Sequence, residues 1–195
     1  MKEAHNRIFF VTSNNHKFKE VNEVFQDASM NFRLEQSKIE PIEIQAPSCK
    51  QVALYKLNSI KDKLDGSIFV EDAGFFVERP LNGFPGVYSS YVYKTIGNDG
   101  ILRLIDDFAN TRAYFLSVIA LYFKPLEKEI VFEGKVEGTI SDKIRGKQGF
   151  GFDPIFLPDI NPKFTFAEIS MSEKNRISHR SKALNLLIHF LKEYE

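Results

Sequence analysis

The stretch RIFFVTSNNHKF, residues 7–18, begins the pattern that decides the fold class. Its first six residues form a nearly continuous apolar run, which is typical of a short buried strand. Apolar residues then recur at helical spacing, at Phe18, Val21, Val24 and Phe25. This spacing predicts an amphipathic helix from residue 15 to about residue 28. A strand followed at once by a helix indicates an α/β arrangement.

The same alternation continues toward the middle of the chain. FRLEQ at 32–36 is a second strand candidate, and two prolines bracket an extended segment at 39–47. Apolar residues on one helical face predict a helix over 48–64, and SIFVE at 67–71 reads as a buried strand. The order strand–helix–strand–helix–strand predicts an α/β sheet that is at least partly parallel.

The second half has longer strands and more glycine. A short turn or helix follows NGFPG, and a helix is expected over 98–108, with Asn98 or Asp99 as its cap. Strands are predicted at 112–123, 129–141 and 155–158, with an irregular glycine-rich segment at 145–154. The last stretch is helical, with a capping box from Ser170 to Glu173 and a break near Ser178. Without repeats or linkers, residues 1–195 are expected to form a single domain.

Composition narrows the classes of partner. Lys+Arg and Asp+Glu both number 26, so the formal charge is zero, which argues against duplex nucleic acid or an anionic membrane as the main partner. Cys49 is the only cysteine, so no internal disulfide can form, and a cytoplasmic location is expected. The start of the chain lacks a signal-peptide pattern, and no apolar stretch approaches the ~20 residues of a spanning helix.

The turn between the first strand and helix is a candidate anion site. The first N–H groups of a helix lack intrahelical partners, and the helix dipole is positive there. The polar residues of this turn can add donors and a cation: Thr12, Ser13, Asn14, Asn15, His16 and Lys17. The stretch lacks the glycines of a P-loop. An ordinary helix cap beside a solvated lysine is the competing interpretation.

Three carboxylates are candidates for metal binding or for positioning a water. Glu71 and Asp72 follow a buried strand, where ligands of α/β sheets commonly bind, and Glu43 lies in the extended segment. Adjacent strand residues point to opposite faces, so Glu71 and Asp72 need not share a site. Taken singly, each is more simply a polar strand end or a solvated edge residue.

Two further segments carry candidate base-binding residues. GFGFDP combines flexible backbone with two phenylalanines, which suits a slot for a planar base; the alternative is a bulged turn with core aromatics. The basic stretch EKNRISHR offers Lys174, His179 and Arg180 as donors, or is simply a solvated basic helix face. The scattered histidines lack zinc-ligand spacing.

The order of four segments along the chain is a more specific signal than any one of them alone. VTSNNHK, VEDAGFFVERPLNGFPGVYSSYV, GFGFDPIF and FAEISMSEKNRISHR resemble the inosine triphosphate pyrophosphatase family, and the resemblance extends from Ile8 to the final helix. It implies an α/β fold with an elongated mixed central sheet flanked by helices, and two lobes with a substrate cleft between them. It further implies Mg²⁺-dependent hydrolysis of ITP, dITP and XTP to the monophosphate and pyrophosphate, which removes deaminated purines from the nucleotide pool. Family members are usually homodimers.

The resemblance also assigns roles to residues. Thr12 to Lys17 would hold the triphosphate, and Asp72 would be the catalytic carboxylate and a magnesium ligand. Glu43 would complete the metal site, assisted by Glu71. The base would contact Phe150, Gly151, Phe152 and Asp153 and be read by Lys174, His179 and Arg180.

Two positions depart from the family pattern. Ala73 stands where a serine or threonine normally contacts substrate, so one hydroxyl contact worth about 1 kcal/mol is lost. Phe152 replaces a tyrosine or tryptophan and lacks its polar group. Two alternatives stay open: a related enzyme for modified pyrimidine triphosphates, and a nucleotide-binding protein without catalysis.

Overall fold

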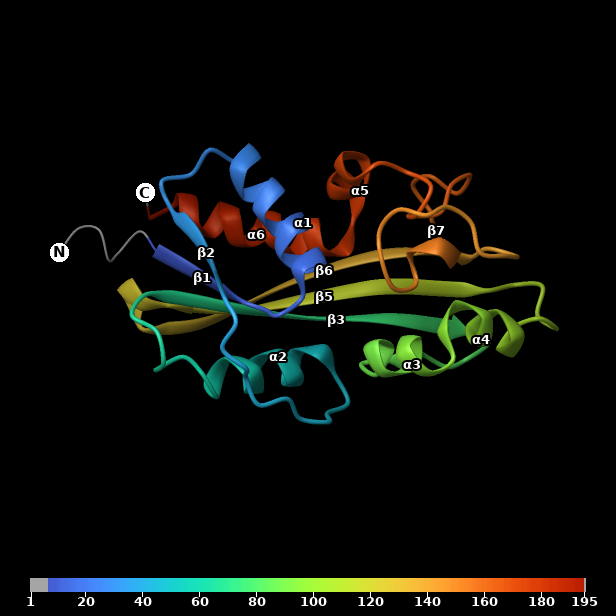
Figure 1. Ribbon diagram of the computed structural model, residues 1–195, viewed down its shortest axis with the longest axis horizontal. Coiled ribbons are helices and arrows are strands. Elements are labelled where there is room, and N and C mark those ends of the chain that lie inside the picture. Colours follow the sequence, from blue (N-terminus) through green and yellow to red (C-terminus); the bar gives the residue numbers. More distant parts are fainter. Residues whose placement is uncertain (1–6, 195) are drawn as a thin grey trace. The chain divides into compact units, whose positions relative to one another are not determined.

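The computed structural model describes residues 7–194 (Figure 1). The first six residues, which begin the segment that lacks a signal-peptide pattern, lie outside the described residues. Seven strands form a mixed sheet in the order β2-β1-β3-β5-β6-β7, with β4 paired to β3. None of the helices within residues 7–194 combines the length and apolarity that crossing a membrane requires. The predicted α/β class, with parallel and antiparallel pairs in one sheet, is confirmed.

Most predicted elements are present. The strands are β1 (Arg7–Val11), β2 (Arg33–Ser37), β3 (Ser67–Arg79), β4 (Phe84–Gly86), β5 (Arg112–Phe123), β6 (Lys128–Ile140) and β7 (Phe156–Pro158). The α-helices are α1 (Asn15–Asp27), α2 (Cys49–Asn58), α3 (Ser89–Thr95), α4 (Gly97–Leu104), α5 (Met171–Ile177) and α6 (His179–Lys192). The predicted capping box of Ser170 and Glu173 is formed, and α5 ends at Ser178 as expected.

Some predictions are wrong: the ends of α2, α4 and β3, and the cap of α4. Helix α2 stops at Asn58, where the next residue, Ser59, donates its hydroxyl to the Lys56 carbonyl at 2.7 Å. Such a side-chain hydrogen bond competes with the backbone hydrogen bonds that would continue the helix. Neither expected residue caps α4, which begins after Ile96 without a side-chain cap. Strand β3 runs past residue 71, because Gly74 lets β4 pair closely; a Cβ there would lie 2.6 Å from the Gly86 carbonyl oxygen.

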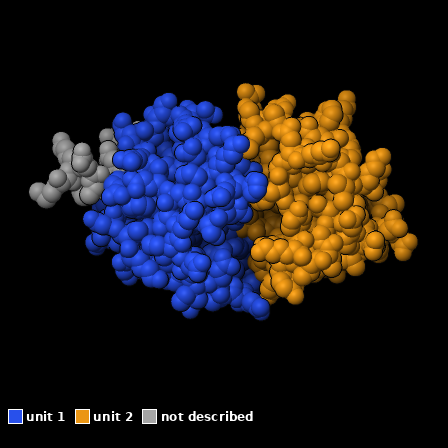
Figure 2. All heavy atoms as spheres, viewed as in Figure 1, with its two compact units in different colours: residues 1–72, 117–134, 180–195 blue, residues 73–116, 135–179 orange. Residues whose placement is uncertain are grey.

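The chain divides into two compact units (Figure 2). Unit 1 contains residues 1–72, 117–134 and 180–195, and unit 2 contains residues 73–116 and 135–179. Each has its own hydrophobic core. The expected single-domain organisation stays a prediction.

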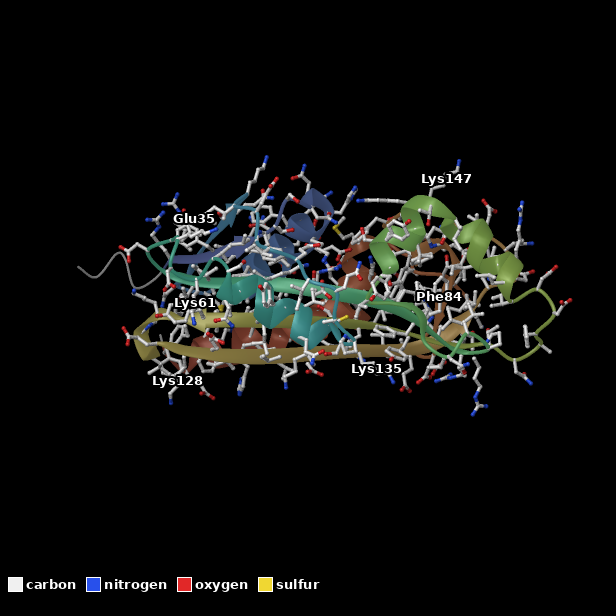
Figure 3. All side chains as sticks on the ribbon, turned by 90° about the horizontal axis from the view of Figure 1, so that it is seen from below. Glu35, Lys61, Phe84, Lys128, Lys135 and Lys147 are labelled. Carbon is white, nitrogen blue, oxygen red and sulfur yellow. The ribbon has the colours of Figure 1, made fainter. Side chains whose placement is uncertain are left out.

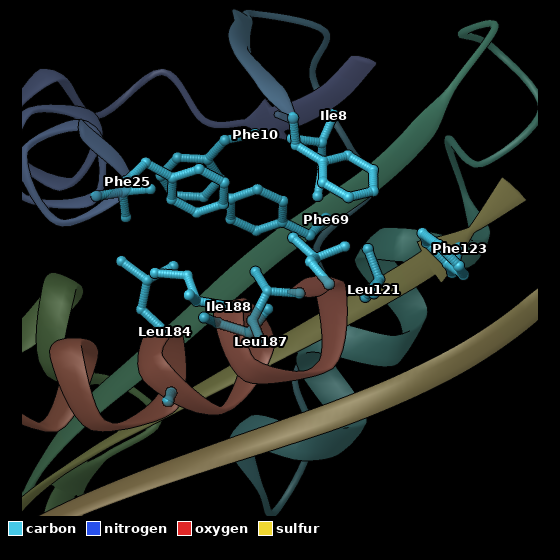
Figure 4. Packing of buried hydrophobic residues seen from close by; sticks show 14 residues of the cluster. Ile8, Phe10, Phe25, Phe69, Leu121, Phe123, Leu184, Leu187 and Ile188 are labelled. Atoms are coloured by element: carbon cyan, nitrogen blue, oxygen red, sulfur yellow. The ribbon is translucent and has the colours of Figure 1, made fainter. Parts of the chain in front are cut away.

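The core of unit 1 is rich in aromatic rings. Phe10 of β1 and Phe69 of β3 stack at 4.6 Å between ring centroids and 3° between planes, and Phe25 of α1 stacks on Phe69 from 6.3 Å (Figure 4). Apolar residues of α6, among them Leu184 and Leu187, belong to the same cluster. This packing fixes α1 and α6 against the central strands, so it positions the polar residues at the start of each helix.

The strand order of unit 1 reverses at β1. Strands β2 and β3 are both parallel to β1 and pair with opposite edges of it. After β2 the chain crosses to the other edge of β1, so α1 and α2 cover opposite sides of these strands. Helix α6 lies on the same side as α1 (Figure 1). Such a reversal of strand order opens a crevice at the carboxyl ends of the strands, where α/β proteins bind ligands. Strand β1 ends at Val11, and its last residue paired to β3 is Phe10, opposite Phe69. Glu71 and Asp72 follow Phe69 in β3, so they lie near the carboxyl end of β1.

Candidate active site

The β1–α1 turn is built as a helix start. The Asn14 side-chain oxygen accepts hydrogen bonds from the backbone N–H groups of His16 and Lys17 at 3.0 and 3.1 Å. The Thr12 hydroxyl accepts from the Asn14 N–H at 3.1 Å. The capping interpretation of Asn14 is therefore confirmed. Lys17 is not a solvated lysine, because its side chain is only 18% exposed and its Nζ lies 2.6 Å from Glu71 Oε2.

Glu71 is the centre of a buried charge network. Its Oε1 accepts from the Ser117 hydroxyl at 2.8 Å and from Arg180 at 3.1 Å, while its Oε2 faces Lys17. Arg180 also pairs with Glu20 of α1. Burial raises the pKa of Glu71, but the positive charges of Arg180 and Lys17 outweigh it and hold this pKa well below the usual range. Glu71 therefore stays ionised and holds the Lys17 ammonium in place.

We expect this network to make stability depend on pH in the acid range. Because folding lowers the pKa of Glu71, its contribution is complete above the ordinary glutamate pKa of about 4.3 and is lost as pH falls below that value. The difference in unfolding free energy between wild type and Glu71→Gln should shrink by about 1–2 kcal/mol between pH 6 and pH 3. Urea denaturation across this range measures it.

Glu35→Gln is the control for that measurement. Glu35 (Figure 3) belongs to a partly exposed pair with Arg7 at 2.8 Å, so its substitution should leave the acid dependence nearly unchanged. A difference between wild type and Glu71→Gln that stays constant down to pH 3 would contradict the assigned ionisation of Glu71.

Asp72 faces a different set of partners from Glu71, as strand alternation predicted. Its Oδ1 accepts from Lys56 Nζ of α2 at 2.9 Å, and the same ammonium lies 2.8 Å from Glu43 Oε1. Asp72 Oδ2 is buried and has no hydrogen-bond partner among the described residues. Burial lowers the pKa of Lys56, but the charge of Asp72 and the hydrogen bond to Glu43 raise it above its usual value.

The buried Cys49 thiol stands at the start of α2. Burial raises its pKa, the charge of Asp72 and a hydrogen bond with Asp72 raise it further, as does the charge of Glu71, whereas Lys17 lowers it. One thiol at the start of α2 therefore experiences the charges of both carboxylates and of Lys17. The thiol therefore stays protonated.

The donor set around Asp72 fits a magnesium ion. Mg²⁺ is usually held by one or two carboxylates together with substrate phosphates and waters. Asp72 supplies a buried oxygen without a hydrogen-bond partner, and Glu43 supplies a second carboxylate that is 67% exposed. Within residues 7–194 no cluster of three or more His, Cys, Asp or Glu side chains has the geometry of a metal site. Both Glu71 oxygens already face donors, so its metal role stays a prediction that this geometry does not favour.

The remaining predicted residues, apart from Arg180, lie in unit 2. Asp153 Oδ2 accepts from the Phe150 N–H and from Lys174 Nζ, both at 2.7 Å. Lys174 Nζ also lies 5.0 Å from the centroid of the Phe150 ring. These contacts close the glycine-rich turn, with Gly151 φ at +65°, and the Asn98 amide holds the Gly151 carbonyl at 3.2 Å.

Two aromatic side chains among the candidate base-binding residues, those of Phe152 and His179, are core residues. Phe152 is 2% exposed and stacks on Phe75 with ring centroids 5.0 Å apart. His179 is 3% exposed and stacks on Phe115 at 4.7 Å. The alternative interpretation of this segment, a turn with aromatic residues in the core, therefore fits Phe152. A contact between Phe152 and a base stays a prediction.

The sequence patterns did not single out Lys56 or Glu20. Lys56 follows Val52 and Ala53 at helical spacing and so lies in an apolar helical face, whereas the helical neighbours of Glu20 are mostly polar and give no such signal. Both residues are less than 10% exposed. Charged residues at buried positions are rare unless they are paired, so a charge inside an apolar face is the signal that points to Lys56.

Fold and site together define an α/β protein with paired carboxylates and lysines at the strands where the sheet order reverses. The chain belongs to the Ham1 family, whose model matches residues 8–190.

Relatives of known name and structure match almost the full length. A dITP/XTP pyrophosphatase of Hyperthermus butylicus is 46% identical over 187 residues, covering 96% of this chain and 95% of that protein. One of Thermococcus kodakarensis is also 46% identical over 187 residues, covering 96% of this chain and 98% of that protein. A solved HAM1 protein from Coxiella burnetii superimposes with a TM-score of 0.84 at 28% identity, covering 96% of this chain and 98% of that one.

Proposed function

We propose that this protein hydrolyses ITP, dITP and XTP to the nucleoside monophosphate and pyrophosphate. The observation that carries the proposal is the near-full-length identity of 46% to proteins named dITP/XTP pyrophosphatase. The site in unit 1 supports it independently, because a helix start, a buried lysine and two carboxylates are the groups that triphosphate hydrolysis requires.

In this proposal the residues of unit 1 handle the phosphates. The helix start at Asn15 and the ammonium of Lys17 bind phosphate charge, and Glu71 keeps that ammonium oriented. Glu43 and Asp72 would hold Mg²⁺, which would supply charge neutralisation and an ordered water when bound. Asp72 also takes a proton from the attacking water. A bond forms from the water oxygen to the α-phosphorus, and the bond to the pyrophosphate oxygen breaks.

The residues of unit 2 would select the base. Hypoxanthine and xanthine carry a carbonyl at position 6, whereas adenine carries an amine. Donors from Lys174 and His179, with the predicted contribution of Arg180 from unit 1, would pair with that carbonyl and would face hydrogens on adenine. Donors left unpaired in a buried site are costly, so discrimination against adenine should be strong.

A panel of nucleotides tests the function directly. Pyrophosphate release with Mg²⁺ should be at least about 100-fold faster in kcat/KM for dITP and XTP than for dATP, because the mismatch leaves polar groups unpaired. Modified UTP and CTP belong in the same panel. Preference for a modified pyrimidine would favour the related pyrimidine enzyme, and tight dITP binding without pyrophosphate release would favour a nucleotide-binding protein without catalysis.

We further propose that the protein acts in the cytoplasm as a homodimer, without nucleic acid or membrane as a partner. The balanced charge and the single cysteine support the location and the excluded partners. Exposed tyrosines of α3, with Tyr91 at 70% and Tyr93 at 42%, support an interface with a second copy. Sedimentation equilibrium of the purified protein tests the dimer.

A further inference from the structure

Lys56 occupies the position between the two carboxylates assigned to the metal. Its ammonium lies 2.8 Å from Glu43 Oε1 and 2.9 Å from Asp72 Oδ1. The lysine side chain is 10% exposed and the Asp72 side chain 12% exposed, so their pairing is little screened by solvent. Lys56 takes no part in the proposed hydrolysis of the triphosphate.

The charges of this group are unbalanced. Two carboxylates and one ammonium leave one net negative charge, and Asp72 Oδ2 is buried with no hydrogen-bond partner among the described residues. A further positive charge is therefore favoured there. A divalent cation that used both carboxylates, however, would lie close to the ammonium that already contacts Glu43 Oε1 and Asp72 Oδ1, and two cations at such short distance repel.

We propose that the Lys56 ammonium and the divalent cation compete for Glu43 and Asp72, so that the metal binds well only together with the triphosphate. This inference rests on the proposed function, because the triphosphate is the anion that receives the displaced ammonium. Binding of metal and nucleotide is then coupled, and by linkage each raises the affinity for the other by the same factor.

This coupling has a consequence for the resting protein. The Lys56 ammonium offsets one of the two carboxylate charges while no nucleotide is bound, so free metal gains less at the site than it would without Lys56. The triphosphate brings the negative charge that makes both cations favourable at once. Lys56 thus links metal binding to the presence of substrate.

Metal binding to the full-length protein tests the proposal without relying on activity. Mn²⁺ is titrated alone and with α,β-methylene dITP, and bound Mn²⁺ is followed by electron paramagnetic resonance. In the wild type, the nucleotide analogue should tighten Mn²⁺ binding at least about tenfold. Lys56→Met should bind Mn²⁺ alone at least about fivefold more tightly than the wild type, with a smaller gain from the analogue.

Lys61→Met is the matched control. Lys61 (Figure 3) pairs with Glu129 at 2.7 Å in the same unit, and its substitution should leave both Mn²⁺ affinities unchanged. Lys56→Gln, which keeps hydrogen-bond donors for both carboxylates, replaces the methionine variant if that variant does not fold. Unchanged or weaker Mn²⁺ binding by the folded Lys56 variant would overturn the proposal. Failure of the wild type to release pyrophosphate from dITP would instead count against the proposed function.

Discussion

Replacing Asp72 with asparagine should lower kcat for pyrophosphate release from dITP by roughly 10³-fold while leaving the fold intact. Asparagine keeps the size of the side chain and an oxygen toward Lys56, but it removes the negative charge. Both roles proposed for Asp72, holding the metal and accepting a proton, depend on that charge. Steady-state kinetics with purified protein, checked by circular dichroism, measures the effect.

Glu129→Gln is the control for this experiment. It removes a carboxylate from the partly exposed pair with Lys61 in the same unit, so kcat and KM should stay close to wild type. A folded Asp72→Asn protein with near-normal turnover would show that the catalytic role belongs to another residue.

Replacing Arg180 with methionine should destabilise the protein by about 3–5 kcal/mol. The Arg180 side chain is 3% exposed and pairs with Glu71, at 0%, and Glu20, at 5%. Methionine preserves much of the volume but leaves both carboxylates without this cation in a buried setting. Urea or thermal denaturation measures the loss, and wild-type denaturation at the same pH is the reference.

The same variant separates two roles for Arg180. Its guanidinium donates to Glu71 and pairs with Glu20, an arrangement that suits a positioning residue for Glu71 and Lys17. Lys182→Met, two residues further along α6, controls for the loss of one positive charge from this helix. If Arg180→Met kept wild-type stability but lost the preference for dITP over dATP, the base-reading role would be correct and the positioning role wrong.

The alternation of apolar periods was enough to predict the fold class and most elements. Strand β5 was predicted with the observed bounds, and the capping box of α5 was visible in the sequence because its two residues are local. The boundaries that failed depend on other contacts. Strand β3 continues because β4 pairs with it at Gly74, and a single-sequence pattern does not contain that pairing.

The residues of the site also divide into those that the sequence made candidates and those whose partners only packing determines. From residue types and spacing Lys17, Glu43 and Asp72 were candidates only, and the family resemblance predicted that they serve a triphosphate and a metal. The sequence did not show that Lys56 bridges the two carboxylates, or that Arg180 is held by Glu71 and Glu20. These pairs join residues far apart in the chain, so only packing decides which charges meet.

Periodicity and capping are properties of neighbouring residues, so they were enough to predict the α/β class, most of the elements and the set of polar residues. Only the tertiary structure decided that Glu71 holds Lys17 while Asp72 shares Lys56 with Glu43. The physical reason is that consecutive strand residues face opposite sides of the sheet, and the helices on each side supply different cations.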